Sequence, residues 1–220
     1  MRQLLHKLWR ALLALAILLL LGVAGVCIWT FLYTGDLPDV KKLSQFNPPA
    51  NSVVSDSCLA GPSTAVPFER IGEPFGNALV AVENPSSMPL RIASSLLCDH
   101  TKGNIRRGLK ELRLAWHIRR QFSEQEIFVI YANRSYFGPG MIGVENASRQ
   151  LFHKEPDALT IEQAALIAGL IRAPGVYSPY KYPDRALQRR NKVLELMKAQ
   201  GKLGAADAAR LEATPLGIQE

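Results

Sequence analysis

The hydrophobic and polar positions of this chain alternate with the period of an α-helix over most of its length. Between Asn104 and Gln121, apolar residues recur at helical spacing, with Asn104 in the N-cap position. Ser123 and Glu126 form the capping-box pattern of a second helix, which should end in the glycine-rich stretch 138–143. No alternation typical of β-strands is visible, so the predicted class is mostly α. Further short helices are predicted over 77–83, 90–97, 144–152, 161–171, 184–200 and 205–211. Thr160 and Gln163 form a capping box before the helix over 161–171, and Asp184 can cap the helix that follows.

The N-terminal part contains an uncharged apolar run. Residues 11–33 are long enough to cross a bilayer as a single helix. The basic residues Arg2, Lys7 and Arg10 precede the run, which places the N-terminus in the cytoplasm and the following domain outside. We expect an uncleaved anchor. A cleaved signal peptide is the alternative, but its apolar region is usually shorter and ends in small residues.

Composition divides the chain into three parts. We expect a basic tip and transmembrane anchor over 1–34, an extended stalk or lead-in rich in Pro, Ser, Asn and Asp over 35–67, and one helical domain over 68–220. The net charge of +7 suits a surface facing anionic lipid headgroups or an acidic ligand. Nucleic acid is not expected as a partner, because the domain is predicted to be exported.

Residues with the potential for metal or sulfur chemistry are few. The four histidines are scattered, so no metal-ligand cluster is predicted, and no phosphate-binding Walker loop or nucleophile elbow occurs. Cys58 and Cys98 both lie in the part predicted to be exported, where a disulfide can form. Two free thiols are the alternative, which the sequence leaves open.

Two acidic residues are attached to apolar patterns. Glu111 projects from the apolar face of the helix predicted after Asn104, with Arg107 one turn earlier on the same face. A structural Arg–Glu pair and a functional carboxylate both explain it. Glu83 directly follows the apolar run 68–82. It is either a solvated carboxylate at a helix end or a second functional acid.

Several short motifs follow one another in an order that is more specific than any one of them. They are Glu83-Asn84, Arg107-x-x-x-Glu111, Ser123-x-x-Glu126-Ile127, Tyr131-x-Asn133, Tyr136-Phe137-Gly138-x-Gly140-x-x-Gly143, Ala173-Pro174-x-x-Tyr177-Ser178-Pro179 and Arg189-Arg190-Asn191. This series resembles glycosyltransferase family 51, the peptidoglycan glycosyltransferase domain of class A penicillin-binding proteins and of monofunctional transglycosylases.

The resemblance implies a lysozyme-like helical glycosyltransferase domain with one N-terminal transmembrane helix. Such a protein polymerises lipid II at the bacterial cytoplasmic membrane, with its main domain on the periplasmic or extracellular side. The expected partners are therefore the membrane, lipid II, undecaprenyl-diphosphate-linked glycan and a protein of cell-wall synthesis. A divalent metal such as Mg²⁺ on the diphosphate is implied by the resemblance alone.

The resemblance also assigns roles to individual residues. Glu83 matches the general base that acts on the acceptor 4-hydroxyl, and Glu111 with Arg107 matches the group that assists the departing diphosphate. Tyr136 and Arg189 match further positions of the substrate cleft.

The chain departs from the family pattern around its first two motifs. Asn84 stands where the family has Asp, and a segment between the first and second motifs is absent. The second motif survives only in outline over 86–95, with Arg91 as its nearby basic residue and expected substrate ligand. Two hypotheses follow: an active, divergent glycosyltransferase, or a relic that binds lipid II or a cell-wall partner without turnover. A lytic enzyme on the same scaffold is a third.

Overall fold

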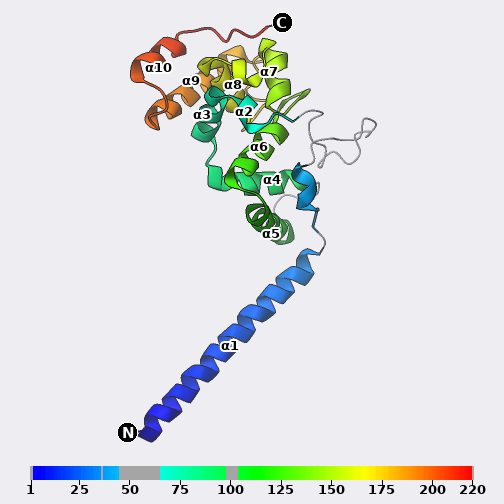
Figure 1. Cartoon of the computed structure of the whole chain (residues 1–220), viewed down its shortest axis with the longest axis vertical. Coiled ribbons are helices and arrows are strands. Elements are labelled where there is room, and N and C mark those ends of the chain that lie inside the picture. The colour runs from blue at the N-terminus through cyan, green and yellow to red at the C-terminus, as the bar shows by residue number, and fades with distance from the viewer. Residues whose placement is uncertain (1, 36, 45–64, 98–103, 220) are drawn as a thin grey trace.

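The computed structural model describes residues 2–35, 37–44, 65–97 and 104–219. Within these ranges, a long N-terminal helix leads into a helical domain that carries one small β-hairpin (Figure 1). The α-helices are α1 (Arg2–Thr34), α2 (Phe68–Ile71), α3 (Glu73–Val82), α4 (Met88–Leu96), α5 (Ile105–Gln121), α6 (Glu124–Arg134), α7 (Val144–Phe152), α8 (Ile161–Leu170), α9 (Pro183–Ala199) and α10 (Ala205–Glu212). The 3-10 helices and strands are η1 (Val40–Ser44), η2 (Pro85–Ser87), η3 (Pro156–Ala158), β1 (Tyr136–Gly138) and β2 (Met141–Ile142). The mostly α class is confirmed.

Capping residues define the helix boundaries much as the sequence predicts. The Asn104 side chain accepts a hydrogen bond from the backbone N–H of Arg106, so α5 begins where expected. The capping boxes that begin at Ser123 and Thr160 both form, and they start α6 and α8. α9 is different, because Tyr182 is its N-cap and Asp184 lies in its first turn.

The glycine-rich stretch after α6 forms the antiparallel hairpin β1–β2, which the sequence does not reveal. The strands are too short to show any alternation of polar and apolar positions. Gly138 and Gly140 adopt φ values of 143° and 75°, which side-chain-bearing residues rarely adopt. The glycines therefore shape a tight turn that leads into α7.

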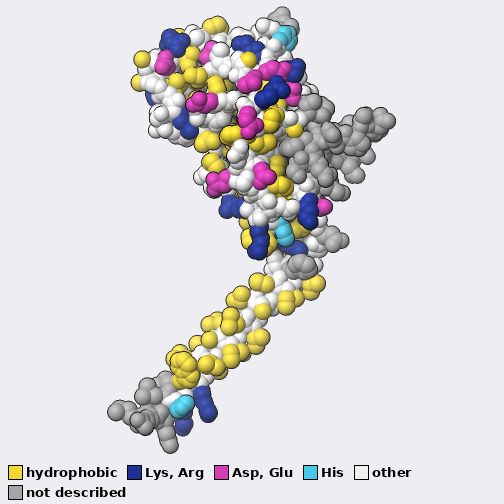
Figure 2. All heavy atoms as spheres, in the orientation of Figure 1, with side chains coloured by type: hydrophobic (Ala, Val, Ile, Leu, Met, Phe, Trp, Pro, Cys, Tyr) yellow, Lys and Arg dark blue, Asp and Glu magenta, His cyan; other side chains and the backbone are white. Residues whose placement is uncertain are grey.

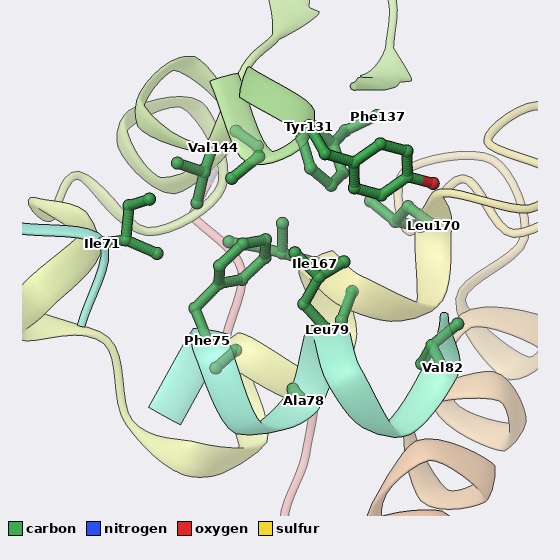
Figure 3. Packing of buried hydrophobic residues seen from close by; sticks show 14 of the residues in the cluster. Ile71, Phe75, Ala78, Leu79, Val82, Tyr131, Phe137, Val144, Ile167 and Leu170 are labelled. Atoms are coloured by element: carbon green, nitrogen blue, oxygen red, sulfur yellow. The ribbon is translucent and has the colours of Figure 1, made fainter. Parts of the chain in front are cut away.

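The core is centred on α3 and α8, which pack against each other and against α9. Every residue of α8 from Ala164 to Leu170 is buried, as expected for an almost wholly apolar helix. Figure 3 shows Phe75 and Leu79 of α3 pointing toward Ile167 of α8, with Val144 of α7 closing the cluster. This burial removes the apolar surface of several helices from water, which is the main force that stabilises the domain.

The domain meets α1 at the end formed by α5, and α10 lies at the opposite end (Figure 1). α1 contains the segment Trp9–Thr30, which is long and apolar enough to span a bilayer and is not covered by the other described residues. In the described part of the predicted stalk 35–67, η1 packs on α5 and its Val40 and Leu43 are buried. The lead-in is thus partly docked on the domain.

Candidate active site

Glu83 lies at the C-terminal end of α3, where the chain leaves the helix. Its backbone N–H still donates to the carbonyl of Leu79, but its φ and ψ of −118° and 126° are extended and direct the chain toward α4. The residue is only 1% exposed. The interpretation of Glu83 as a solvated helix-end carboxylate is therefore wrong. The C-terminal end of α3 is buried because α3 packs along α8.

Two arginines flank the buried carboxylate. Arg91 Nε of α4 lies 3.6 Å from Glu83 Oε2, and Arg172 Nε lies 3.4 Å from Oε1. Both arginine side chains are about half exposed, so they connect the buried acid with solvent. A buried carboxylate needs such opposite charge, because its hydration has been lost.

The ion pairs leave Glu83 Oε1 without a hydrogen-bond donor in the described part of the chain. A buried acceptor without a donor costs free energy, and such atoms are rare in folded proteins. The oxygen therefore keeps an unused capacity to accept a hydrogen bond, but the protein encloses it in this structure.

A cavity of about 240 Å³ is lined by Arg91 of this cluster, whereas Glu83 and Arg172 are not among its lining residues. Its walls come from α4, from the end of α6 with β1, and from the segment after α8, and they include Arg91, Tyr131, Arg134 and Tyr136. Burial raises the pKa of Tyr131 to about 12, and the negative charge of Glu83 adds to this effect. Burial also lowers the pKa of Arg134. The cavity thus places a neutral phenol among cationic side chains, next to a carboxylate.

Glu111 has a different environment. Its Oε1 accepts from Arg107 Nε at 2.9 Å and from the Ser94 hydroxyl at 3.0 Å. The other nitrogens of Arg107 donate to the carbonyls of Ser94 and Leu97, at 3.2 and 3.3 Å. All these groups are partly buried and paired within the protein. This geometry favours the structural interpretation of the Arg107–Glu111 pair, which fastens α5 to α4.

Both acids are nevertheless connected to the same helix. Arg91 binds Glu83 and Ser94 binds Glu111, and these two α4 residues are three positions apart. Residues at this spacing are neighbours on a helix surface. α4 therefore links the buried acid at the end of α3 with the ion pair on α5.

The remaining predicted site residues are distributed differently. Tyr136 is exposed and lines the cavity beside Arg91. Arg189 is not among the residues that line this cavity; its Nε donates to the Gly169 carbonyl at 3.1 Å and its guanidinium lies over the Tyr177 ring. Arg189 thus joins α9 to the C-terminal end of α8, where a cation is favoured. Cys58 and Cys98 lie outside the described residues.

The described side chains do not form a metal site of their own. No group of three or more His, Cys, Asp or Glu side chains is close enough in the described ranges to hold a cation. The groups found around Glu83 are guanidinium groups, which repel a divalent metal. These residues therefore do not fit a resident metal ion.

The sequence did not point to Arg172 as a partner of Glu83. The two residues have a common signal, since each is a charge at the C-terminal end of a buried apolar helix: Glu83 directly follows α3, and Arg172 follows the C-cap of α8. Because α3 and α8 pack together, these charged ends meet. Tyr131 was recognised only as part of a motif, and its effect on the site depends on burial that emerges from the tertiary fold.

Comparison with protein families identifies a matching segment. Residues 91–198 match the profile of a family described as Transglycosylase. The match begins at Arg91 and so includes the Arg107–Glu111 pair, the glycine hairpin and Arg189. Glu83 lies just before it, so the role of Glu83 still depends on the motif resemblance.

Individual relatives have similar names. The chain is 29% identical to penicillin-binding protein 1A of Aquifex aeolicus over 92% of this chain and 34% of that protein, and 38% identical to penicillin-binding protein 1A/1B of Bacillus subtilis over 58% of this chain and 15% of that protein. A Cupriavidus necator protein, provisionally named a transglycosylase, is 28% identical over 94% of this chain and 97% of its own length. The chain therefore spans 34% and 15% of the length of the two penicillin-binding proteins.

A solved structure confirms the fold. Penicillin-binding protein 1A of Haemophilus influenzae superposes with a TM-score of 0.52 at 21% identity, over 71% of this chain and 18% of that one. The Aquifex alignment is 246 positions long, more than the 220 residues of this chain. The relative thus contains residues within the aligned region that this chain lacks.

Proposed function

Since the chain belongs to the transglycosylase family over residues 91–198, we propose that it is a peptidoglycan glycosyltransferase that polymerises lipid II into glycan strands. α1 anchors the protein in the cytoplasmic membrane, and its apolar segment Trp9–Thr30 supports this assignment. The domain then works on the outer side of that membrane, as the basic residues before α1 indicate.

The observation that carries the proposal is the state of Glu83. The buried carboxylate of Glu83 has one oxygen without a donor among the described residues, and it is paired with Arg91, which lines the cavity. Once uncovered, such a carboxylate is suited to accept a proton from a bound hydroxyl group. In the proposed reaction, Glu83 Oε1 takes the proton of the acceptor 4-hydroxyl as that oxygen attacks the donor sugar. The bond between this sugar and undecaprenyl diphosphate breaks, and the diphosphate departs with the bonding electrons.

The arginines near Glu83 have a second function in this proposal. Arg91 and Arg172 are half exposed, and their contacts with Glu83 are longer than direct hydrogen bonds. They can therefore turn toward a diphosphate without breaking a short contact, which would uncover Glu83 and stabilise the charge of the leaving group. Binding of the anionic substrate and exposure of the base would then occur together.

Glu111 and Arg107 contribute to the reaction by positioning α4. Their hydrogen bonds hold α4 against α5, and α4 carries Arg91. A direct contact with the departing diphosphate, as the resemblance implies, would require Arg107 to exchange its protein acceptors for phosphate oxygens. A divalent metal, if bound, would come with the diphosphate and would help to neutralise its charge.

The test is polymerisation of lipid II by the purified full chain in detergent, with the glycan product separated by length. We expect strands from the wild type and none from Glu83→Gln. Glu73→Gln is the matched control, because Glu73 lies on the exposed part of the same helix. Equal product from the wild type and from Glu83→Gln would exclude Glu83 as the base.

A second candidate function is binding of lipid II or of a cell-wall partner without turnover. The 1% exposure of Glu83 favours it, because a base that stays covered cannot reach a substrate. This candidate predicts saturable binding of lipid II and no polymer, with or without added Mg²⁺. Any polymer from the wild type that is lost in Glu83→Gln would rule it out.

A further inference from the structure

A second cavity lies where α1 joins the domain, away from Glu83. It has a volume of about 510 Å³, which is within the range of small-molecule sites. The end of α1 and the lead-in provide one wall, with Leu32, Gly35 and Asp39, and α5 provides the other, with Arg113, His117 and Gln121. None of these residues was assigned a role in glycosyl transfer.

The position of the cavity relative to a bilayer follows from α1. The apolar segment of α1 ends at Thr30, and the cavity begins at Leu32, less than one helical turn further on. If α1 spans the membrane as proposed above, the cavity opens at the level of the lipid headgroups. A hydrocarbon core would not tolerate its polar walls, and the bulk solvent lies further out.

α5 has the composition of a helix that lies at a membrane surface. It carries six Arg or Lys residues and one acidic residue. Ile105, Leu112 and Trp116 are 77%, 60% and 54% exposed, although they belong to the apolar part of the helix pattern. Exposed apolar side chains next to basic ones are typical of interfacial helices. Figure 2 shows Lys and Arg side chains gathered on the end of the domain that meets α1.

Two arginines of α5 contact the end of α1 beside the cavity. Arg106 Nε donates to the Tyr33 carbonyl at 3.0 Å, and its guanidinium lies over the Tyr33 ring. Arg113 donates to the Gly35 carbonyl at 3.4 Å. These carbonyls are at and just beyond the C-terminal end of α1, where the helix dipole favours cations. These contacts therefore connect the α5 wall of the cavity to the end of α1.

We propose that this junction cavity binds the headgroup of an anionic phospholipid that carries hydroxyl groups, such as a phosphoglycerol headgroup. Arg113 and His117 donate to the phosphate oxygens, and Gln121 provides a further polar group. Asp39, which already accepts from the backbone N–H of Lys41, is placed to accept from a headgroup hydroxyl. The acyl chains extend along the apolar surface of α1.

The experiment uses the full chain in a neutral detergent, without lipid II, and measures binding by titration calorimetry. The probes are short-chain phosphatidylglycerol, short-chain phosphatidylcholine and inorganic phosphate. Three variants each lower the charge of α5 by one: Arg113→Gln, His117→Glu and Arg120→Gln. Arg120 is the matched control, because it is exposed on the same helix, stacks on Trp116 and does not line the cavity.

We expect phosphatidylglycerol to bind, and Arg113→Gln and His117→Glu to weaken this binding by about tenfold or more, since each removes or opposes a charge-assisted contact. Arg120→Gln should change it by less than about twofold. Equal weakening by all three variants would show that the lipid binds to the general positive charge of α5 and not in the cavity. If phosphatidylcholine binds as tightly as phosphatidylglycerol, the ligand is not selected by its negative charge. If inorganic phosphate binds and phosphatidylglycerol does not, the ligand is free phosphate and not a lipid headgroup.

Arg113 also contacts Gly35, just after α1, so Arg113→Gln could loosen the junction itself. In that case His117→Glu provides the test. Circular dichroism of each variant checks that the helices are retained. Failure of the chain to polymerise lipid II would leave this inference intact, because lipid II is absent from the binding assay. Conversely, loss of phosphatidylglycerol binding would not affect the role of Glu83.

Discussion

Glu83 and Glu111 are both carboxylates with arginine partners, but the structure treats them differently. Glu111 pairs with Arg107 one turn away on its own helix, and its contacts are short hydrogen bonds. The partners of Glu83 come from other segments, Arg91 from the next α-helix and Arg172 from a distant part of the sequence. Its ion pairs are longer, and one of its oxygens has no hydrogen-bond donor among the described residues. A satisfied pair stabilises a fold, whereas an unsatisfied one retains the capacity to react.

The largest expected effect comes from a change at Glu83. Glu83→Gln should lower the rate of lipid II polymerisation by about 10²- to 10⁴-fold, which is the usual contribution of a general base. The same change should alter the thermal unfolding temperature little, because Arg91 and Arg172 remain half solvated without it. Rate and unfolding temperature measured on one preparation separate the two effects. A large drop in unfolding temperature would make Glu83 a structural residue like Glu111.

A second effect is the pH dependence of stability that comes from Tyr131, which lies near Glu83. Because the pKa of Tyr131 is raised from 10.0 to about 12 in the folded protein, Tyr131 contributes stability that is complete below pH 10 and is lost as the pH rises to 12. The loss should be about 2–3 kcal/mol. Tyr131→Phe should remove this alkaline fall in the free energy of unfolding, measured by denaturation at pH 9 to 12.

The Glu83→Gln variant sharpens this result. Without the negative charge, the pKa of Tyr131 should move down toward its usual value, which the ultraviolet absorbance of tyrosinate detects. An unchanged titration would mean that Glu83 does not act on the cavity.

Changes to the Arg107–Glu111 pair should lower the free energy of unfolding. Glu111→Ala removes the Arg107 ion pair and the Ser94 hydrogen bond from a partly buried site, and should cost about 1–2 kcal/mol of unfolding free energy. Chemical denaturation followed by circular dichroism measures it. Glu195→Gln, in the exposed Lys192–Glu195 pair of α9, is the control and should have no measurable effect. If both variants behave alike, the buried pair has no special structural role.

The smallest effect isolates one contact between α4 and α5. Ser94→Ala removes only the hydroxyl that donates to Glu111 and should cost about 0.5–1 kcal/mol in the same denaturation assay. A loss as large as that of Glu111→Ala would show that Ser94, and not Arg107, holds the acid in place.

The sequence alone determined most of the local structure of this protein. Asn104 and the capping boxes at Ser123 and Thr160 start helices where predicted, because a cap needs only neighbours along the chain. The Arg107–Glu111 pair was also predictable, because its members are one helical turn apart. The family followed from several motifs in order, and the match over residues 91–198 confirms it.

Only the tertiary structure decided the state of Glu83. A charged residue directly after an apolar run is expected to be solvated. Glu83 is buried because α3 packs along α8, and the same packing brings Arg172 next to it. Likewise, α5 exposes Ile105, Leu112 and Trp116, although their helix pattern predicts burial. Periodicity shows which face of a helix is apolar, but whether protein or lipid covers that face depends on how the helices pack.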